Sequence, residues 1–439
     1  MKVLKFGGTS VGSSQRMKDV VKLITDGQPK IVVLSAMSGT TNSLLEICDY
    51  LYKKNPEGAF ELIRALEKKY RGHIEELYST QEYKDKTADF LKQEFDFLRS
   101  FTAKSLFTKF EEKIIVGQGE ILSTNMVTNY LLEQGHDVSL LSALDFMRTD
   151  KNGEPDPEYI SRKLREIIDQ QPDKELYVTQ GFICRNAYGE IDNLERGGSD
   201  YTASLIGAAI QADEIQIWTD IDGMHNNDPR FVEGTSPVGQ LHFEEAAELA
   251  YFGAKILHPT CVQPAKFAGI PVKLLNTMDP TAPGTVITAA TEKKKIKAVA
   301  AKDGITAIRI TSSRMLLAYG FLRKVFDIFE QYKTSIDMVC TAEVGVSVSI
   351  DNTTHLDAIV SELKKFGRVE IDRGMCIICV VGDLEPQNTG FQSKATNALS
   401  EIPIRMISYG GSNHNISFLI SETDKQRALQ ALQDKLFKG

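Results

Sequence analysis

The chain has 439 residues, of which 42% are hydrophobic and 25% charged, and its formal net charge is −8. This length exceeds one ordinary hydrophobic core, so we expect two or three domains. The acidic balance argues against nucleic acid as a partner, because binding to a phosphate backbone needs a basic face. No stretch reaches the roughly 18 apolar residues of a membrane helix, so we expect a cytoplasmic protein with no membrane partner.

The first predicted strand begins at Val3 and leads into the segment Lys5–Ser10, which turns on Gly7 and Gly8. Glycines have no Cβ atom, so their backbone N–H groups can approach an anion closely, as a phosphate requires. Lys5 adds a positive charge just before the turn. Taken alone, such a pattern is more often an ordinary turn with a surface lysine, since glycine pairs are common in turns.

The next elements alternate between helix and strand. Residues 13–26 have apolar side chains at helical spacing, and 31–36 form a continuous apolar run of the kind found in buried parallel strands. A small-residue turn at 38–42 then opens a helix at 43–52. This α/β pattern predicts a mostly parallel sheet, in which ligands gather at the carboxyl ends of the strands.

Residues 57–113 have the pattern of charged amphipathic helices, which we interpret as a structural insert over the edge of the sheet. A helix at 117–133 follows. Glu120 lies in its first turn among glycines and apolar residues, a setting that makes its carboxylate a candidate functional group. The alternative stays open, because acidic residues also favour the first turn of a helix for electrostatic reasons.

Further strands are predicted at 138–141 and 176–183, and a second glycine segment, Arg196–Asp200, then leads into a helix. We expect Ser199 or Asp200 to be the N-cap of that helix. The helix N-terminus offers N–H groups and a positive dipole to a phosphate. An aspartate beside a phosphate is repulsive unless it orients Lys5 or a metal-bound nucleotide.

A strand at 215–220 is followed by a loop at 228–230. Arg230 and Lys255 are cations in small or apolar turns, so they are candidates for nucleotide contacts, with surface ion pairs as the alternative. His258, which precedes a proline, indicates a structural histidine rather than a ligand.

The last third follows a different pattern, in which a solvated linker at 292–295 precedes two rounds of strands and helices. The first round is βαββαβ, with strands at 305–310, 335–340, 344–350 and 369–381 and helices at 321–332 and 356–366. The second round has helices at 391–399 and 425–437 and strands at 404–409 and 415–420. Because the second round lacks one strand, which 296–301 can supply, we expect the first unit to be inserted into the second.

The six cysteines show no paired framework, which is typical of a reducing compartment. Cys376 and Cys379 have the CxxC spacing of some zinc sites, but they lie in an apolar strand, where their side chains point to opposite faces. We therefore predict buried strand cysteines and no metal site.

Together these segments resemble aspartate kinases of the amino-acid kinase superfamily. The resemblance rests on five motifs in the family's order, namely Lys5–Ser10, Gln180–Ile183, Arg196–Ala203, Trp218–Asp220 and Phe252–Pro259. It implies an α/β amino-acid kinase fold, with three layers around a mostly parallel central sheet, followed by two ACT domains of the ferredoxin-like α+β type. The implied boundaries are 1–290 for the catalytic domain with its helical insert 57–113, 291–304 for a linker and a strand of the second ACT domain, 305–375 for the first, effector-binding ACT domain, and 376–439 for the second.

The resemblance implies ATP-dependent phosphorylation of the side-chain carboxylate of L-aspartate to 4-phospho-L-aspartate, with Mg²⁺ accompanying ATP. This reaction is the first step of the diaminopimelate route to lysine, threonine and methionine. A carboxylate nucleophile is already ionised at pH 7, so the reaction needs positioning and charge neutralisation rather than a general base.

The family's motifs assign roles to residues of this sequence. The implied catalytic residues are Lys5 at the transferring phosphoryl group, Gly8, and Asp200 holding the lysine. The implied aspartate-binding residues are Ser35, Thr41, Glu120 for the α-ammonium and Arg196 for the α-carboxylate. The implied ATP-binding residues are Lys5, Gly7, Gly8, Ser10, Gly197, Gly198, Ser199, Thr219, Asp220, His225, Arg230, Lys255 and Ile256. One departure affects the adenosine contact, because His225-Asn226-Asn227 replaces the aromatic and small hydroxyl residues of relatives.

The paired ACT domains of this family bind a regulatory amino acid between subunits, which implies a homodimer or homotetramer. The implied effector-site residues are Met315, Ala318, Phe321, Leu322, Ser335, Ile336, Asp337, Thr341 and Glu343. The chain is most similar to the lysine-inhibited class, although Ala318 and Tyr319 depart from it. Two alternatives stay open: an amino-acid sensor with a degenerate kinase domain, which predicts loss of Lys5 or Asp200, and a related kinase acting on another carboxylate.

Overall fold

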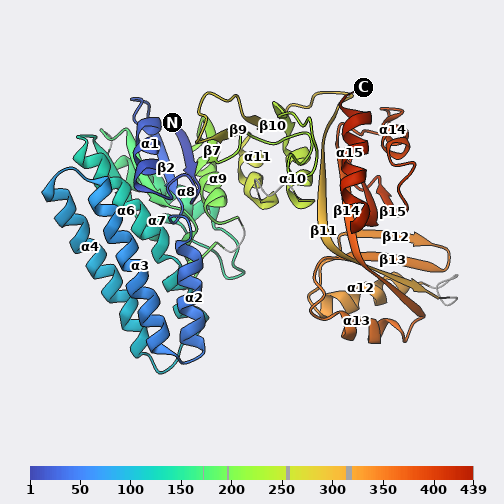
Figure 1. Ribbon diagram of the computed structural model, residues 1–439, viewed down its shortest axis with the longest axis horizontal. Helices are drawn as coiled ribbons and strands as arrows, with labels where there is room; N and C mark the ends of the chain where they lie inside the picture. Colours follow the sequence, from blue (N-terminus) through green and yellow to red (C-terminus); the bar gives the residue numbers. More distant parts are fainter. Residues whose placement is uncertain (172, 195–196, 254–257, 313–318, 439) are drawn as a thin grey trace. The chain divides into compact units, whose positions relative to one another are not determined.

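The computed structural model in Figure 1 describes residues 1–171, 173–194, 197–253, 258–312 and 319–438. The chain divides into two compact units, one formed by Met1–Gly223 with Ile256–Ala289 and the other by Met224–Lys255 with Ala290–Gly439. The predicted catalytic segment 1–290 is therefore shared between the units, and the domain boundaries stay a prediction. Among the helices of the described ranges, none combines the length and the apolar character that a membrane crossing requires.

The first unit is built around a sheet with the strand order β3-β4-β2-β1-β7-β9-β10. These strands are β1 Lys2–Phe6, β2 Lys30–Leu34, β3 Val138–Leu141, β4 Leu176–Gln180, β7 Glu214–Thr219, β9 Val272–Asn276 and β10 Thr285–Thr288. All neighbours from β3 to β9 pair in parallel, and β10 is antiparallel to β9. The strands β2 and β4 are buried along their whole length, as expected where helices cover both faces of a parallel sheet.

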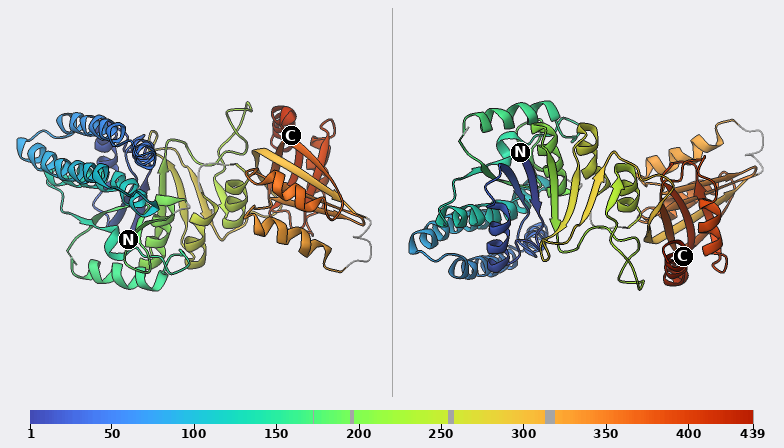
Figure 2. Two further views of the ribbon diagram at one scale, coloured as in Figure 1. Left: turned by 90° about the horizontal axis from the view of Figure 1, so that it is seen from below. Right: turned by 90° about the horizontal axis from the view of Figure 1, so that it is seen from above.

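Helices cover both faces of this sheet, and the two views in Figure 2 show the strands between them. One face packs into a single hydrophobic core with α1 Ser14–Ile24, α2 Thr40–Tyr52, α3 Pro56–Leu77, α4 Gln81–Ser100, α5 Lys109–Val116 and α6 Gln118–Glu133. The other face is covered by α9 Gly198–Ile210, against which α8 Pro157–Asp169 and α11 Gln263–Ala268 pack. The unit also contains the short helix α7 Ala143–Phe146 and the 3-10 turns η1 Phe101–Ala103 and η2 Pro259–Val262. The predicted three-layer α/β architecture is confirmed.

Two elements differ from their predicted bounds because of left-handed backbone. The helix α2 begins at Thr40 rather than at residue 43, since Gly39 at φ +80° turns the chain directly into it. The predicted strand 176–183 ends at Gln180, because Phe182 adopts φ +68°. The chain then forms a separate hairpin of β5 Ile183–Arg185 and β6 Ile191–Asn193.

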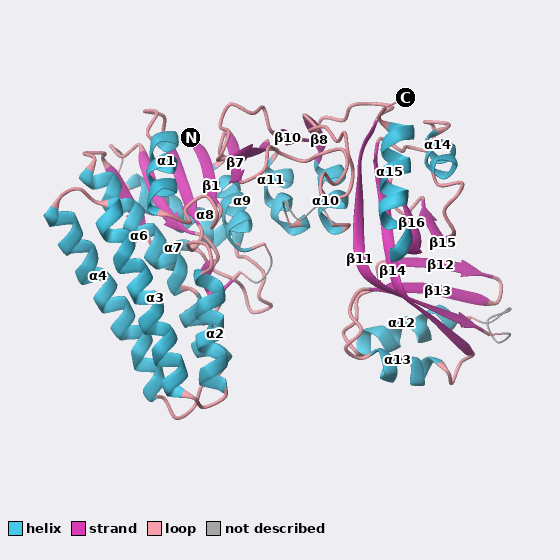
Figure 3. Ribbon diagram, viewed as in Figure 1, coloured by secondary structure: helices cyan, strands magenta, loops and turns pink. Residues whose placement is uncertain are grey.

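The second unit contains an antiparallel sheet with the order β12-β13-β11-β14-β16-β15, drawn in magenta in Figure 3. These strands are β11 Ile296–Thr311, β12 Met338–Ala342, β13 Gly345–Ile350, β14 Arg368–Gly382, β15 Ile404–Tyr409 and β16 Asn415–Ser421. One apolar core lies under α12 Phe321–Gln331 and α13 Leu356–Leu363, and another under α14 Phe391–Ala398 and α15 Lys425–Leu436. The remaining elements are β8 Gln240–His242, α10 Phe243–Tyr251 and η4 Glu422–Asp424.

The strands predicted at 296–301 and 305–310 are one 16-residue strand, β11. It pairs along its length with β14, and the register shifts near Lys302 and Ile305, where the first round of the repeat begins. The two rounds therefore share one sheet through β11 and β14, as an insertion of the first round into the second would require. Cys376 faces the core under α14 and α15, while Cys379 is fully buried outside that core, as alternation along a strand requires.

Candidate active site

Polar side chains from several elements of the first unit converge at the carboxyl edge of its sheet. Gly8 follows β1 and Ser35 follows β2, while the turn before α2, the first turn of α6 and the first turn of α9 complete the walls. They enclose a cavity of about 280 Å³. Its lining residues are Gly8, Ser35, Ala36, Met37, Ser38, Gly39, Thr41, Glu120, Phe182, Gly198 and Ser199.

Glu120 is the acidic residue of this cavity and is only 4% exposed. Its Oε1 accepts a hydrogen bond from the Ala36 N–H at 3.2 Å, and its Oε2 is buried with no hydrogen-bond partner. Burial raises the pKa of Glu120 from 4.5 to about 8, because a charged carboxylate is poorly solvated there. A buried carboxylate with an unused oxygen is suited to receive a cationic group of a ligand.

Lys5 and Asp200 form an ion pair next to the cavity, with 2.6 Å between Nζ and Oδ1, and both side chains are mostly buried. Lys5 comes from β1, and Asp200 comes from the first turn of α9. The ammonium also lies close to the glycine turn, since a Cβ atom on Gly7 would be 3.5 Å from it. Ser35 donates a hydrogen bond to Ser199 at 2.9 Å, which joins the end of β2 to the same helical turn.

The start of α9 provides the anion-binding geometry. Its N-cap is Gly197, so the prediction of Ser199 or Asp200 as N-cap is wrong. Both residues lie inside the first turn, where their side chains pair with Ser35 and Lys5 instead of capping the helix. The N–H groups of Gly198 and Ser199 therefore belong to the first turn, which has no intrahelical acceptors for them and which favours anions.

The first glycine segment contributes differently from its prediction. The Gly7 N–H donates to the Trp218 carbonyl oxygen at 3.3 Å and so continues the pairing of β1 with β7. It is not directed at the cavity, which corrects the expectation that Gly7 supplies a donor to a phosphate. Gly8 does line the cavity, and its carbonyl oxygen accepts from the Ser38 N–H at 3.1 Å. The segment therefore links β1 to the turn before α2.

Gly197 is required for two separate reasons. Its φ is +71°, and a Cβ atom there would lie 2.0 Å from the Cys261 Sγ. The exposed turn residue Gly189 has φ +82° but no atom within 4 Å of an added Cβ. We expect Gly197→Ala to lower the free energy of unfolding by about 1–3 kcal/mol more than Gly189→Ala, because only the former adds overpacking to the left-handed strain. Thermal and urea unfolding of the two variants measures the difference, and equal losses would contradict the packing argument.

The other predicted nucleotide contacts are more scattered. Ser10 is fully buried, with its hydroxyl 2.7 Å from the Thr277 hydroxyl, and Thr219 accepts a hydrogen bond from the Ile221 N–H. Asp220 is exposed at the end of β7. His225 and Arg230 belong to the second unit, where the Arg230 guanidinium pairs with Asp228 at 2.6 Å. The predicted site residues Arg196, Lys255 and Ile256 lie outside the described residues.

The predicted effector residues lie in the second unit. Phe321 is part of the core under α12 and α13, whereas Leu322, Ser335, Thr341 and Glu343 are exposed and Ile336 is half-buried. Met315 and Ala318 lie outside the described residues. The strand β12 begins at Met338 rather than at residue 335, so Ser335, Ile336 and Asp337 precede it.

Asp337, a predicted effector residue, already pairs with two other side chains of the second unit. The side chain of Asp337 is 1% exposed, and its Oδ1 accepts hydrogen bonds from the Tyr251 hydroxyl at 2.6 Å and from the Lys302 Nζ at 2.7 Å. Lys302 also lies 2.9 Å from Asp351 and over the ring of Tyr251. The other oxygen of Asp337, Oδ2, is buried with no partner.

Sequence reasoning missed Phe182, which lines the cavity. Its left-handed backbone is rare for a bulky residue and costs on the order of 1–3 kcal/mol. The Phe182 N–H donates to Thr202 on α9, and its ring contacts the position where Gly198 would carry a Cβ atom. Only the motif Gln180–Ile183 pointed to this part of the chain.

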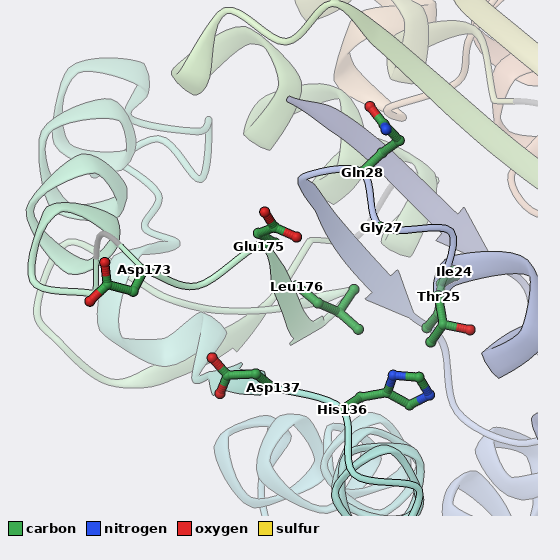
Figure 4. Close-up of a pocket in the computed structure, with 9 residues that line it drawn as sticks. All are labelled: Ile24, Thr25, Gly27, Gln28, His136, Asp137, Asp173, Glu175 and Leu176. Atoms are coloured by element: carbon green, nitrogen blue, oxygen red, sulfur yellow. The ribbon is translucent and has the colours of Figure 1, made fainter.

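Two other cavities lack the features of a phosphate site. One of about 320 Å³ lies at the amino ends of the strands, and Figure 4 shows its carboxylates Asp137, Asp173 and Glu175, which would repel an anion. Another of about 500 Å³ between α8, α9 and α11 is lined mainly by apolar residues such as Leu205 and Phe267. The cavity at the carboxyl edge is the smallest of the three, but it joins a buried acid, a cation and a helix N-terminus.

Comparisons with known proteins identify the family of the chain. Residues 1–276 match the family model described as the amino acid kinase family, and residues 378–436 match an ACT domain model. The chloroplastic aspartokinase 3 of Arabidopsis thaliana is 35% identical, covering 99% of this chain and 81% of that protein. The lysine-sensitive aspartokinase 3 of Escherichia coli (strain K12) is 32% identical, covering 99% of each. The crystal structure of E. coli aspartokinase III in complex with aspartate and ADP (R-state) superimposes with a TM-score of 0.85 at 31% identity and covers 100% of both chains.

Proposed function

The chain belongs to the amino acid kinase family, and within it to the aspartokinases, and we propose that Lys5, Asp200 and Glu120 carry its phosphorylation of aspartate. The observation that supports this assignment most is the unused buried oxygen of Glu120, in a cavity that adjoins the Lys5–Asp200 pair. A kinase for an amino acid needs an anionic group for the substrate's ammonium and a cationic group for the phosphoryl group. The cavity offers the anionic group, Glu120, and the adjoining pair offers the cationic group, Lys5.

In the proposed reaction, a side-chain carboxylate oxygen of L-aspartate attacks the γ-phosphorus of ATP. The bond between that phosphorus and the β,γ-bridging oxygen breaks, and ADP leaves with the electron pair. Negative charge spreads over the phosphoryl oxygens, which Lys5 and the N–H groups of Gly198 and Ser199 neutralise. Asp200 keeps the Lys5 ammonium at this place, and it does not need to accept a proton, because the nucleophile is already ionised.

Glu120 orients the amino acid by pairing with its α-ammonium, while Ser35 and Thr41 line the same cavity. We propose Arg196 for the α-carboxylate on the basis of the family motif alone. Mg²⁺ is expected to enter with ATP, since this ion is usually held by substrate phosphates, water and one or two carboxylates. Of the two described aspartates at this edge of the sheet, Asp220 is exposed and fits that limited role, whereas Asp200 is engaged with Lys5.

A degenerate, sensor-type kinase domain is disfavoured, because Lys5 and Asp200 are both present and paired. The test is an ATP-dependent hydroxamate assay that compares L-aspartate with L-glutamate and N-acetyl-L-glutamate. We expect hydroxamate from L-aspartate at least tenfold faster than from the other two acids. Product from another acid alone would assign the chain to a different carboxylate kinase, and no product from any acid would support the sensor alternative.

We further propose that the reaction opens the diaminopimelate route and that L-lysine is the effector, bound at the first ACT domain, 305–375, of a cytoplasmic homodimer or homotetramer. Support comes from the antiparallel sheet of the second unit and from the related E. coli protein, which is named lysine-sensitive. Because the Lys302 ammonium already forms an ion pair with Asp337, we propose that the effector's ammonium must displace it.

Replacing Lys302 should therefore change the sensitivity to lysine. We expect Lys302→Met to lower the lysine concentration for half-inhibition at least about threefold, because a buried carboxylate without its cation attracts another cation more strongly. Asp337→Asn should raise that concentration at least about tenfold by removing the charge. Inhibition curves with lysine, threonine and methionine make the measurement, with the exposed Lys324→Met as control. Unchanged or weaker lysine inhibition in Lys302→Met would contradict the displacement.

A further inference from the structure

The helical insert touches the substrate cavity through two successive residues of α3. The Lys69 Nζ donates to the Ser38 carbonyl oxygen at 3.0 Å, and the Tyr70 hydroxyl lies 3.0 Å from the Thr40 hydroxyl. We propose that α3 holds the turn Ser38–Thr41 in place and that Tyr70 and Lys69 are positioning residues for aspartate binding. The inference rests on the proposed function, since it concerns the same cavity.

The turn Ser38–Thr41 needs support from outside. Ser38, Gly39 and Thr41 line the cavity, but Gly39 has a left-handed backbone and no side chain to cap α2. On one side, the Ser38 N–H donates to the Gly8 carbonyl oxygen, which ties the turn to the glycine segment after β1. On the other side, the Ser38 carbonyl oxygen and the Thr40 hydroxyl are held by α3. The two attachments together fix the position of Thr41 in the wall of the cavity.

The Tyr70–Thr40 contact lies beside the acid that is proposed to bind the α-ammonium. Tyr70 and Thr40 are both fully buried, so each hydroxyl depends on the other for a hydrogen bond. The pKa of Tyr70 is raised, mainly by burial and further by the nearby charge of Glu120. Thr40 also packs against α6 directly before Glu120, because a Cβ atom on Gly119 would be 3.3 Å from the Thr40 Cγ2.

This arrangement joins three helices at one point. The helix α3 contributes Tyr70, α2 contributes Thr40, and α6 contributes Glu120. Losing the Tyr70 hydroxyl leaves the Thr40 hydroxyl buried without its partner, and the start of α2 can then shift relative to α6. Two of the residues proposed to hold aspartate, Thr41 and Glu120, lie on α2 and α6, whereas Lys5 and Asp200 lie on β1 and α9. The expected defect is therefore in aspartate affinity and not in phosphoryl transfer.

The chain offers a matched control for Tyr70. Tyr78 follows the same helix α3, is 3% exposed, and its hydroxyl donates to the Met126 carbonyl oxygen at 2.7 Å, on α6 six residues beyond Glu120. Tyr78→Phe therefore removes a buried tyrosine hydroxyl at the end of the same helix without touching the turn Ser38–Thr41. A purely structural role predicts the same kinetics for both variants.

We expect Tyr70→Phe to raise the KM for L-aspartate about 3- to 10-fold, the range that corresponds to one net hydrogen bond. Its kcat and its KM for ATP should stay within about twofold of the wild-type values. Tyr78→Phe should lower the melting temperature about as much as Tyr70→Phe does, and it should leave the KM for L-aspartate unchanged. An unchanged KM in Tyr70→Phe, or an equal rise in Tyr78→Phe, would overturn the inference.

Two further comparisons separate positioning from general loosening. Thr40→Ser keeps the hydroxyl, so its KM for L-aspartate should stay near the wild-type value. Thr40→Val should raise this KM as much as Tyr70→Phe does. The double variant Tyr70→Phe/Thr40→Val should have a KM no higher than that of either single variant. Lys69→Met should raise the KM at least about twofold, and the exposed neighbour Lys68→Met should not. Additive effects of Tyr70→Phe and Thr40→Val would contradict the shared contact. Absence of any aspartate-dependent turnover in the wild-type protein would instead refute the proposed function, so the two failures are distinguishable.

Discussion

Lys5→Met should lower kcat for aspartate phosphorylation by about 10²- to 10³-fold or more. The Lys5 ammonium lies 2.6 Å from Asp200, in a mostly buried place beside the first turn of α9. Removing one preorganised charged donor at a developing negative charge typically has an effect of this size. The measurement is the steady-state rate of hydroxamate formation at saturating ATP and L-aspartate.

The matched control for Lys5→Met is Lys2→Met, since Lys2 lies on the same strand but is exposed at its other end. Its kcat should stay within about twofold of the wild-type value. The KM for L-aspartate should change little in either variant, because the amino group of the substrate is assigned to Glu120. A kcat above one tenth of the wild-type value in Lys5→Met would remove Lys5 from the chemistry.

Glu120→Gln should raise the KM for L-aspartate at least about 30-fold, because breaking a buried charge pair commonly costs 2–5 kcal/mol. The pH dependence provides a sharper test. Free Glu120 has a pKa raised to about 8, and only its ionised form can pair with an ammonium. As the pH is raised toward 8, the KM of the wild-type protein for L-aspartate should therefore fall by roughly tenfold per pH unit. Above pH 8 the KM should level off. The Glu120→Gln profile should be flat over pH 6.5–8.5, and a flat wild-type profile would contradict the assignment.

The same pKa shift predicts a change in stability with pH in the absence of aspartate. The folded-state pKa of Glu120 lies above its ordinary value of 4.5, so the folded protein binds this proton more tightly than the unfolded chain does. The resulting stabilisation is complete below about pH 4.5 and is lost as the pH rises through about 8. Glu120→Gln should consequently melt higher than the wild-type protein at pH 9, with a difference roughly half as large at pH 6.

Local chemistry pointed to the main parts of the candidate site but left alternatives open, and the family's motifs assigned their roles. Glu120 stood out as an acid among glycines and apolar residues, and Asp200 was expected to orient Lys5. The structure brings Lys5 and Asp200 together and places Glu120 in the adjoining cavity. Parallel strands explain this success, since their carboxyl ends meet at one edge of the sheet.

The errors arose where tertiary contacts decide the use of a group that the sequence leaves open. The Gly7 N–H was expected to face a phosphate, but the pairing of β1 with β7 uses it. Ser199 and Asp200 were expected to cap α9, but Ser35 and Lys5 engage their side chains. Asp337 stays a predicted effector residue, but its pairing with Lys302, which lies 35 residues earlier, was not expected.

The role of the helical insert could not be found from periodicity. Tyr70 belongs to the apolar stripe of α3, and its ring is buried as the stripe predicts. Its hydroxyl is what reaches Thr40, and no spacing rule reports the direction of one polar atom within an apolar stripe. The left-handed backbone of Phe182 was equally hidden, because bulky residues rarely adopt it.

The central claim is that the Lys5–Asp200 pair and the Glu120 cavity together transfer a phosphoryl group to the carboxylate of aspartate. The most direct measurement is ³¹P NMR of the wild-type protein with ATP, Mg²⁺ and L-aspartate. The account predicts an acyl-phosphate signal that grows together with ADP, requires L-aspartate, and is absent with Lys5→Met. Formation of ADP and inorganic phosphate with no acyl phosphate, or an acyl-phosphate signal of full intensity with Lys5→Met, would contradict it.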